Sequence, residues 1–286
     1  MVYLSGGSSV SVSKNFLKYC LMFSLALVWL LCIPGRAEAR TYYVTKDGND
    51  SNPGTETSPW LTIKKAADTM SPGDTVYVKA GTYSGVGLQI SGTPGNYISY
   101  RAYPGDTVTV DGFYLYPDVH YIEIDGFDFV SGNIEMAGGA HNFCLFRNNK
   151  IHGGTSTGID FGSGEGNIVE NNEIWNTGHG VHTSGGTVNT IIRNNIIHDC
   201  YLHGLGMVGG TGEKYLNNII YKCTKSGIHP GSGGPSNGEI IGNLVYNNGS
   251  SAIYVSGSNF VIANNTCISK SGSDSETYYI SGSDHV

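Results

Sequence analysis

The sequence predicts an all-β solenoid, and two observations carry this prediction. An asparagine recurs at steps of 22 to 25 residues, at Asn149, Asn172, Asn195, Asn218, Asn243 and Asn265. A repeat of about 23 residues is typical of coils that stack on one another. The chain also has 42 glycines among 286 residues, and only 14% of its residues are charged. This composition suits many short strands joined by tight turns.

The charge of the chain limits its partners. The formal net charge is −7, and the spacings of zinc fingers and RNA-binding motifs are absent. Because surfaces that bind phosphate backbones are rich in lysine and arginine, we expect no nucleic-acid partner. We expect a monomer.

Residues 1–39 have the pattern of a secretory signal peptide. Lys14 and Lys18 precede an apolar run, Leu21–Ile33, and Ala37–Ala39 forms a small-residue cleavage pattern. The run has about 13 residues and a membrane-spanning helix needs about 20, so we expect cleavage and no membrane association afterwards. The sequence therefore predicts a secreted, periplasmic or cell-surface protein.

The remaining residues, 40–286, are predicted to form one β-helix domain, whose first part, 41–75, contains an amino-terminal cap and the first strands. Four short elements are expected in order from residue 41 onward: a strand Thr41–Thr45, a helix Trp60–Met70, a strand Thr75–Ala80 and a turn Gly81–Tyr83. A single helix at the start of a stack of strands suggests a cap over the end of the core.

The coils are expected to be held in register by the recurring asparagines. One amide per coil, stacked inside a turn, can hydrogen-bond along the stack. The segment Ile253–Val261 is echoed 25 residues later by Tyr278–Val286. The chain is therefore expected to stop in mid-coil and to be truncated at its carboxyl end.

Cys200 and Cys223 occupy the same place in adjacent repeats. Stacked strands lie about 4.8 Å apart, which is within reach of a disulfide. Both a bridge and a pair of buried thiols are compatible with this spacing.

The amino-terminal run Tyr42–Tyr83, and the repeat N-N-x-I followed by G-[ILV]-x, are similar to secreted right-handed parallel β-helix proteins of the pectin-lyase-like superfamily. The run resembles the opening segment of family-9-type pectate lyases. The resemblance implies a single-stranded right-handed parallel β-helix with an amino-terminal capping helix, and a polysaccharide partner. The calcium-binding Asp pairs and catalytic Lys of those lyases have no match. Of the polygalacturonase motifs only Gly178–Gly180 matches, so no catalytic residue is carried over.

One external column of side chains is the candidate site. If the aliphatic residue of each G-[ILV]-x strand points inward, the third residue points outward. The column then contains Asp160, His182, Gly206, His229 and Tyr254. His179, His203 and Lys225 lie next to it in sequence. The candidate catalytic residues are His179, His182, His203, His229, Lys225 and Asp160, and the missing side chain at Gly206 is expected to leave a groove.

These residue types favour a polysaccharide lyase acting by β-elimination on an acidic polysaccharide. A lyase needs a base with a pKa near the working pH, and His or Lys can supply it. A glycoside hydrolase is the first alternative, but it needs two carboxylates about 5–9.5 Å apart, and Asp160 has no carboxylate at its register in the next coil. A metal-handling protein or a non-catalytic glycan-binding surface protein is the other alternative. Asp160 and His182 are candidate ligands for a cation such as calcium.

A second column contains flat rings at one repeat position: His152, Trp175, His198, Tyr221 and Tyr246. We expect these rings to stack on one another. Tyr254, Tyr221 and Trp175 are the candidate contacts to a glycan, since aromatic rings pack on sugar rings.

Overall fold

The computed structural model describes residues 38–183, 185–270 and 277–286. The predicted signal peptide, including Cys20 and Cys32, lies outside the described residues except for its last two positions, 38 and 39. Residues 39–286 form one compact unit. None of the helices in the described ranges is long and apolar enough to cross a membrane.

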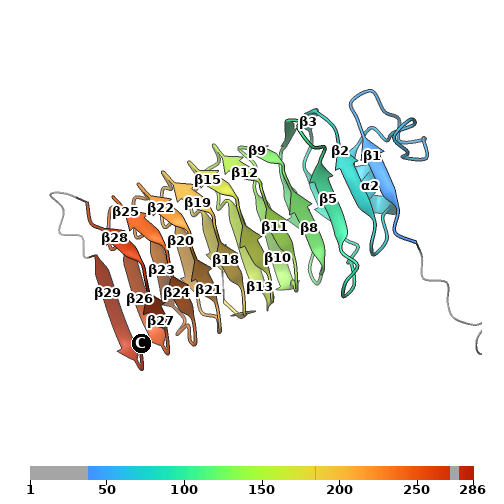
Figure 1. Ribbon diagram of the computed structural model, residues 1–286. Helices are drawn as coiled ribbons and strands as arrows, with labels where there is room; N and C mark the ends of the chain where they lie inside the picture. The colour runs from blue at the N-terminus through green and yellow to red at the C-terminus, as the bar shows by residue number, and fades with distance from the viewer. Residues whose placement is uncertain (1–37, 184, 271–276) are drawn as a thin grey trace, which may run out of the picture. The chain divides into compact units, whose positions relative to one another are not determined.

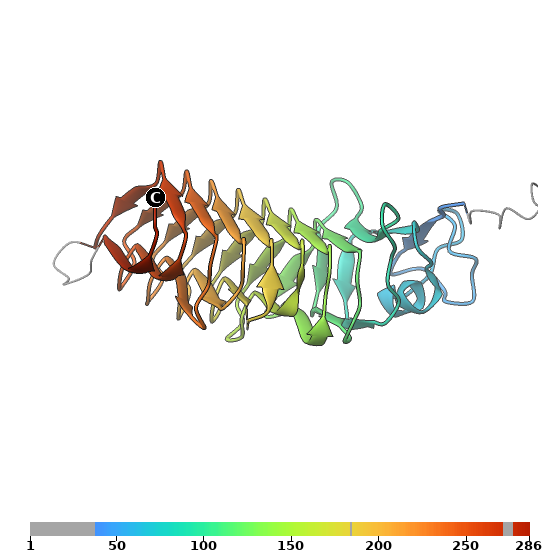
Figure 2. The same cartoon turned by 90° about the horizontal axis from the view of Figure 1, so that it is seen from below.

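The unit is a stack of coils, and each coil contributes strands to three parallel sheets (Figures 1 and 2). Sheet 1 contains β1 (Thr41–Val44), β2 (Thr75–Val78), β5 (Ile98–Ala102), β8 (Ile122–Asp125), β11 (Leu145–Arg147), β14 (Ile168–Glu170), β18 (Ile191–Arg193), β21 (Lys214–Leu216), β24 (Glu239–Ile241) and β27 (Val261–Ala263). Sheet 2 contains β4 (Val86–Leu88), β7 (Phe113–Leu115), β10 (Ile134–Ala140), β13 (Ile159–Glu165), β16 (Val181–Thr183), β20 (Leu205–Val208), β23 (Ile228–Ser232), β26 (Ile253–Ser258) and β29 (Tyr278–Ser283), with β17 (Thr187–Val188) paired to β13. Sheet 3 contains β3 (Gly81–Tyr83), β6 (Val108–Val110), β9 (Asp128–Val130), β12 (Lys150–His152), β15 (Glu173–Trp175), β19 (Ile196–His198), β22 (Ile219–Tyr221), β25 (Leu244–Tyr246) and β28 (Thr266–Ile268).

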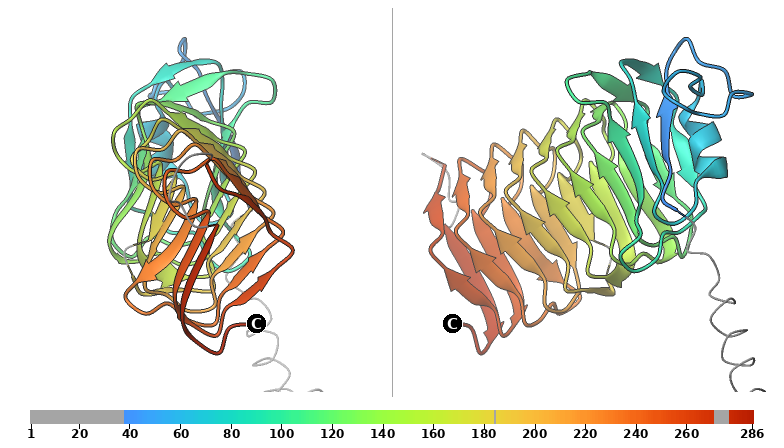
Figure 3. Two further views of the ribbon diagram at one scale, coloured as in Figure 1. Left: turned by 90° about the vertical axis from the view of Figure 1, so that its left-hand side faces the viewer. Right: turned by 45° about the vertical axis from the view of Figure 1, so that its right-hand side comes forward.

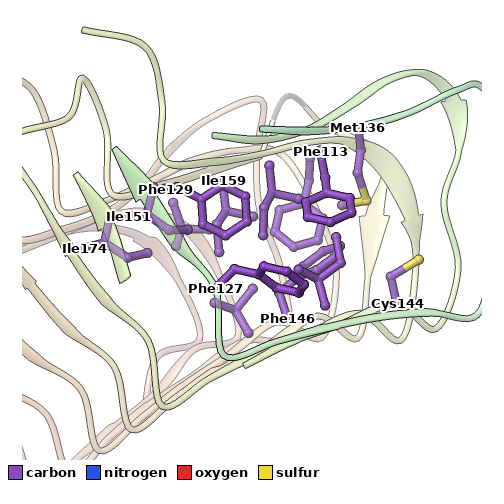
Figure 4. Packing of buried hydrophobic residues seen from close by; sticks show 14 of the residues in the cluster. Phe113, Phe127, Phe129, Met136, Cys144, Phe146, Ile151, Ile159 and Ile174 are labelled. Carbon is purple, nitrogen blue, oxygen red and sulfur yellow. The ribbon is translucent and has the colours of Figure 1, made fainter. Parts of the chain in front are cut away.

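This architecture confirms the predicted solenoid. The nine strands of sheet 3 correspond to nine coils, and partner residues in neighbouring strands are separated by about 23 positions, as in Ile151 and Ile174. The core lies between the sheets, where the middle residue of most three-residue strands is buried. Figure 4 shows Phe113, Phe129 and Ile151 packed in this interior.

The predicted asparagine ladder is confirmed. The Asn195 side-chain oxygen accepts hydrogen bonds from the backbone N–H of Asn172 (2.9 Å) and from its amide (3.0 Å). The Asn195 amide in turn donates to Asn218 Oδ1 at 3.0 Å. The preceding residue, Asn194, has a φ of 56°, the left-handed region that asparagine tolerates well. The repeated Asn-Asn pair therefore combines a tight corner with a bond between coils.

The cap differs in detail from the prediction. The only helix in the described residues, α2 (Ile63–Thr69), begins three residues later than expected because the Thr62 side chain caps it by accepting from Lys65 N–H. Trp60 instead forms an isolated β-bridge with Val44 and stacks on Tyr42 at 4.4 Å. Figure 3 shows α2 at the amino-terminal end of the stack.

The structure also differs from, or decides between, the expectations for the segment Gly81–Tyr83 and for the two stacked cysteines. The turn predicted at Gly81–Tyr83 is wrong, because these residues form β3, the first strand of sheet 3. Cys200 and Cys223 are free, buried thiols. Of the two alternatives for this pair, the structure therefore contains stacked thiols.

Candidate functional site

Sheet 2 presents one outward residue per coil along a single line, which we call the outer row. Parallel pairing aligns its members, and ring stacking continues the line from His229 to Tyr254. In order they are Gly87, Tyr114, Glu135, Asp160, His182, Gly206, His229, Tyr254 and Tyr279. The inward neighbours Ile159, Val181, Leu205, Ile228 and Ile253 are fully buried. The structure thus places the five predicted column residues on one face.

His179 and His203 join this face beside the outer row. The ring of His179 lies 4.9 Å from that of His182 and 5.5 Å from that of His203. His203 stacks on His229 at 4.2 Å. The four imidazoles therefore form one connected cluster, which we call the histidine cluster.

The groove expected at Gly206 is wrong. A Cβ atom at Gly206 would lie 2.5 Å from Nδ1 of His179. The imidazole of His179 therefore covers the space that the missing side chain leaves. Gly206 is needed here so that His179 can lie flat against the strand, between the coils that carry His182 and His229.

Asp160 orients His182. The Nδ1 atom of His182 lies 3.0 Å from Oδ1 of Asp160, and an ionised carboxylate can only accept. Nδ1 therefore carries the proton and donates it to Asp160, so Nε2 keeps a free lone pair. A carboxylate that fixes the tautomer and orientation of an imidazole is also found beside histidines that act as general bases.

His203 has the opposite tautomer. The backbone N–H of Ser226 donates to Nδ1 of His203 at 3.1 Å, so in the neutral ring the proton is on Nε2. Burial, followed by the nearby His229 and His179, lowers the pKa of His203 to about 3. At neutral pH this ring is a neutral hydrogen-bond donor.

His179 and His229 are also kept neutral. Burial and then the proximity of His182 lower the pKa of His179 to about 4, and burial lowers the pKa of His229. Nδ1 of His179 is buried and has no hydrogen-bond partner among the described residues. Lys225 is exposed, and its charge contributes to the lowered pKa of His203. Lys225 is thus a positive charge in the neighbourhood of His203.

The glycan-contact candidates fall on two different faces. Tyr254 is in the outer row, whereas Trp175 and Tyr221 belong to sheet 3, in a column we call the ring ladder. The ring ladder contains His152, Trp175, His198, Tyr221 and Tyr246, with successive centroids 4.1, 5.8, 4.8 and 4.9 Å apart and planes within 10° of parallel. The predicted stacking of this column is confirmed.

Stacking limits what these rings can contact. Tyr254 lies between His229 and Tyr279, each with its ring centre 4.5 Å away. Trp175 and Tyr221 are likewise covered on both faces by their neighbours in the ring ladder. All three rings therefore offer a ligand their edges and polar atoms, while their faces are already in use.

Sequence reasoning missed Glu135. It pairs in register with Asp160 in the preceding coil, so the statement that Asp160 lacks a partner carboxylate holds only for the following coil, where His182 stands. The repeat template requires a glycine before the aliphatic residue, and Asn133 stands there instead. The signal was present: a step of 25 residues back from Asp160 leads to Glu135, between the inward Ile134 and Met136.

A cation at Asp160 and His182, as predicted, would need further ligands around these two side chains. Within the described residues no group of three or more His, Cys, Asp or Glu side chains could hold a metal ion. Asp160 and His182 bond to each other, and they alone do not supply the six to eight oxygen ligands that calcium prefers. The residues present therefore do not fit a calcium ion.

Comparison with known proteins extends these observations. A family model described as the Pel9A-like, right-handed β-helix region matches residues 42–248. The chain is 38% identical over 77 residues to pectate lyase PEL9 of Emericella nidulans, which is 26% of this chain and 19% of that protein. It is 35% identical over 71 residues to the uncharacterized protein YwoF of Bacillus subtilis, 24% of this chain and 15% of that protein. Each match thus spans less than a fifth of the curated relative.

Solved structures share the fold. A rhamnogalacturonan lyase superposes with a TM-score of 0.63 at 19% identity, over 79% of this chain and 73% of its own. An alginate lyase from Paenibacillus sp. gives 0.58 at 18% identity, over 84% and 98%. Pectate lyase Pel9A gives 0.56 at 16% identity, over 85% and 80%. At these identities the likeness establishes the fold, a right-handed parallel β-helix as predicted.

Proposed function

Because the chain belongs to the Pel9A-like right-handed β-helix family, we propose that it is an exported polysaccharide lyase, which cleaves an acidic polysaccharide by β-elimination at the histidine cluster. The observation that carries this proposal is the hydrogen bond between His182 and Asp160. It leaves a lone pair on an outward imidazole whose orientation is fixed by a carboxylate. Relatives such as pectate lyase PEL9 and pectate lyase Pel9A act on a polysaccharide by name, which supports a polysaccharide substrate.

The reaction assigns one role to each group. Nε2 of His182 removes the proton next to the uronate carboxylate, at C5. The electron pair forms the C4–C5 double bond, and the bond from C4 to the glycosidic oxygen breaks. The imidazolium, held by Asp160, returns the proton to the leaving oxygen, so that one residue serves as base and then as acid.

Negative charge accumulates on the uronate carboxylate as the C5 proton leaves. We assign the stabilisation of this carboxylate to Nε2–H of His203, which Ser226 fixes as a donor, and to the positive charge of Lys225. Donors fixed in advance at the point where charge develops lower the barrier. His179 packs between His182 and His203 and keeps them apart at a fixed spacing.

The product identifies the reaction. The conjugated double bond of an unsaturated uronide absorbs in the ultraviolet, whereas a hydrolysed product has no such absorbance. The protein, without residues 1–39, is incubated with polygalacturonate and with alginate while absorbance and reducing ends are measured together. We expect both to rise in parallel; if neither rises with any polyuronide, the lyase proposal fails.

Glycoside hydrolysis is the second candidate, and the register of Glu135 with Asp160 favours it. Adjacent parallel strands lie about 4.8 Å apart, close to the separation of about 5–5.5 Å found for the two carboxyl groups of retaining glycosidases. Reducing ends that appear without ultraviolet absorbance would support this alternative. In that case Glu135→Gln would abolish turnover, whereas the lyase reaction does not use Glu135 for proton transfer.

A further inference from the structure

At the amino-terminal end of the outer row, the surface is hollowed into a cleft of about 340 Å³. Three of the residues that line it are glycines: Gly85, Gly87 and Gly112. The ring of Tyr116 lies against Gly87, where a Cβ atom would be 2.6 Å from it. Gly112 has a φ of 150°, in a region that residues with side chains rarely adopt. We call this hollow the glycine cleft.

Two tyrosines form the walls of the glycine cleft. Tyr114 and Tyr116 are 37% and 43% exposed, and their rings meet at 83° with centroids 5.1 Å apart. Tyr114 has Gly87 and Glu135 as its neighbours in the outer row, so no ring stacks on it there. Whereas Tyr254 is stacked between two rings, Tyr114 and Tyr116 meet edge-on and are partly exposed, and together they form a corner that can hold a partly apolar sugar ring.

The polar lining of the cleft is acidic and unengaged. Asp111, Asn133 and Glu135 line it. Within the described residues, neither carboxylate has an ion pair or a side-chain hydrogen bond. Free carboxylate oxygens accept strong hydrogen bonds from hydroxyl groups, and they repel another carboxylate.

From these observations we propose that the glycine cleft is a sugar subsite selective for a neutral sugar unit, with its ring on Tyr114 or Tyr116 and its hydroxyls bonded to Asp111 and Glu135. The inference rests on the proposed function only in that one polysaccharide chain occupies both the glycine cleft and the histidine cluster. Tyr114 and His182 are three coils apart on one row, which is about 14 Å. One chain can therefore cross both, with a uronate at the histidine cluster and a neutral unit at the cleft.

This arrangement narrows the substrate class to a polysaccharide that contains both uronate and neutral sugars. A polymer of uronates alone would place a carboxylate against Asp111 and Glu135. A neutral unit avoids this repulsion and satisfies the free acceptors. The two parts of the outer row thus differ in charge preference, because the positive charge of Lys225 acts on His203, whereas two unpaired carboxylates line the cleft.

The test is a binding titration that involves no cleavage. Wild-type protein, Tyr116→Ala and Tyr103→Ala are titrated calorimetrically with oligosaccharides of galactose, rhamnose and xylose, and with oligogalacturonate. Tyr103 is the matched control, because it meets Tyr77 edge-on at 78° on another face. We expect Tyr116→Ala to weaken binding of at least one neutral oligosaccharide about tenfold, and Tyr103→Ala to leave it unchanged.

A charge variant tests the selectivity. In Asp111→Asn/Glu135→Gln we expect oligogalacturonate to bind several-fold more tightly than to wild type, because the repulsion is removed. If wild type binds no neutral oligosaccharide, or if Tyr116→Ala and Tyr103→Ala bind them equally, the subsite proposal is overturned, whatever the cleavage assay shows. If neutral sugars bind at the cleft but no uronide is cleaved, the lyase proposal fails and the subsite remains.

Discussion

The histidine cluster and the ring ladder are built by the same repeat, yet they differ in chemistry. Both are columns of rings, one or two per coil, on neighbouring sheets of one solenoid. In the ring ladder the planes are within 10° of parallel and each ring covers the next. In the histidine cluster the planes are tilted by 15° to 30°, and burial lowers the pKa of three imidazoles.

The difference shows that the period alone does not make a site. The period aligns rings, and the residues around each ring decide its chemistry. Asp160 fixes the tautomer of His182, the backbone of Ser226 fixes that of His203, and the lack of a side chain at Gly206 leaves space for His179. In the ring ladder, His152 also meets a carboxylate, Asp128, at 3.0 Å, but through Nε2.

The strongest test of this contrast exchanges one imidazole on each face. His182→Gln keeps a polar side chain of similar size but removes the base, so we expect uronide cleavage to fall about 10²- to 10⁴-fold. His152→Gln is the matched control, since it removes an imidazole of similar exposure that also bonds an aspartate. Initial rates from the ultraviolet assay measure both. Equal losses of cleavage rate in the two variants would mean that the imidazole of His182 contributes no more to cleavage than that of His152.

A smaller effect is expected from Gly206→Ala. The added methyl group meets Nδ1 of His179, so His179 must move and the spacing of His182 and His203 changes. We expect cleavage to fall about 10- to 100-fold, since small displacements of catalytic groups are costly. Gly154→Ala, whose added Cβ would make only ordinary contacts, controls for the substitution itself. If the rates of both variants match wild type, His179 has no positioning role.

Acid should destabilise the protein through the histidine cluster. The pKa values of His179 and His203 are lowered from 6.5 to about 4 and about 3, so below about pH 6.5 the unfolded chain binds protons that the folded chain does not. The free energy of unfolding then falls as pH decreases towards about 4. The slope is at most about 1.4 kcal/mol per pH unit for each ring, and less because both are part-exposed.

Urea unfolding at a series of pH values measures this dependence. The double variant His179→Gln/His203→Gln should lose stability less steeply than wild type between about pH 6.5 and 4, because glutamine does not titrate. Identical slopes for the two proteins would show that these rings are not held neutral by burial.

Sequence reasoning was strong where one rule governs every coil. The asparagine period predicted the solenoid, the ladder and the outward placement of Asp160, His182 and His229, because backbone pairing fixes these positions. It failed where a coil departs from the template. Glu135 lies in β10, which Asn133 precedes in place of the expected glycine, and the filling of the space at Gly206 depends on the direction of a side chain from another segment.

The glycine cleft was missed for a related reason. It lies before the asparagine repeat begins, where Tyr114 and Tyr116 stand among coils of irregular sequence. The face of a ring is available only if its neighbours leave it uncovered, and that depends on three coils at once. Sequence alone therefore identified Tyr254, Tyr221 and Trp175, whose faces are covered, in place of Tyr114 and Tyr116.

The smallest expected effect separates stacking from catalysis. Tyr246→Leu removes the last aromatic ring of the ring ladder, which stacks on Tyr221 at 4.9 Å, and keeps an apolar side chain. We expect a loss of about 1 kcal/mol in the free energy of unfolding and an unchanged rate of uronide cleavage. Tyr254→Leu is the counterpart in the outer row, where the ring stacks between His229 and Tyr279. It should cost a similar stability but also slow cleavage, because His229, on which His203 stacks at 4.2 Å, loses the ring that fixes its plane. A fall in cleavage for folded Tyr246→Leu would place the ring ladder in the site and remove the distinction between the two columns.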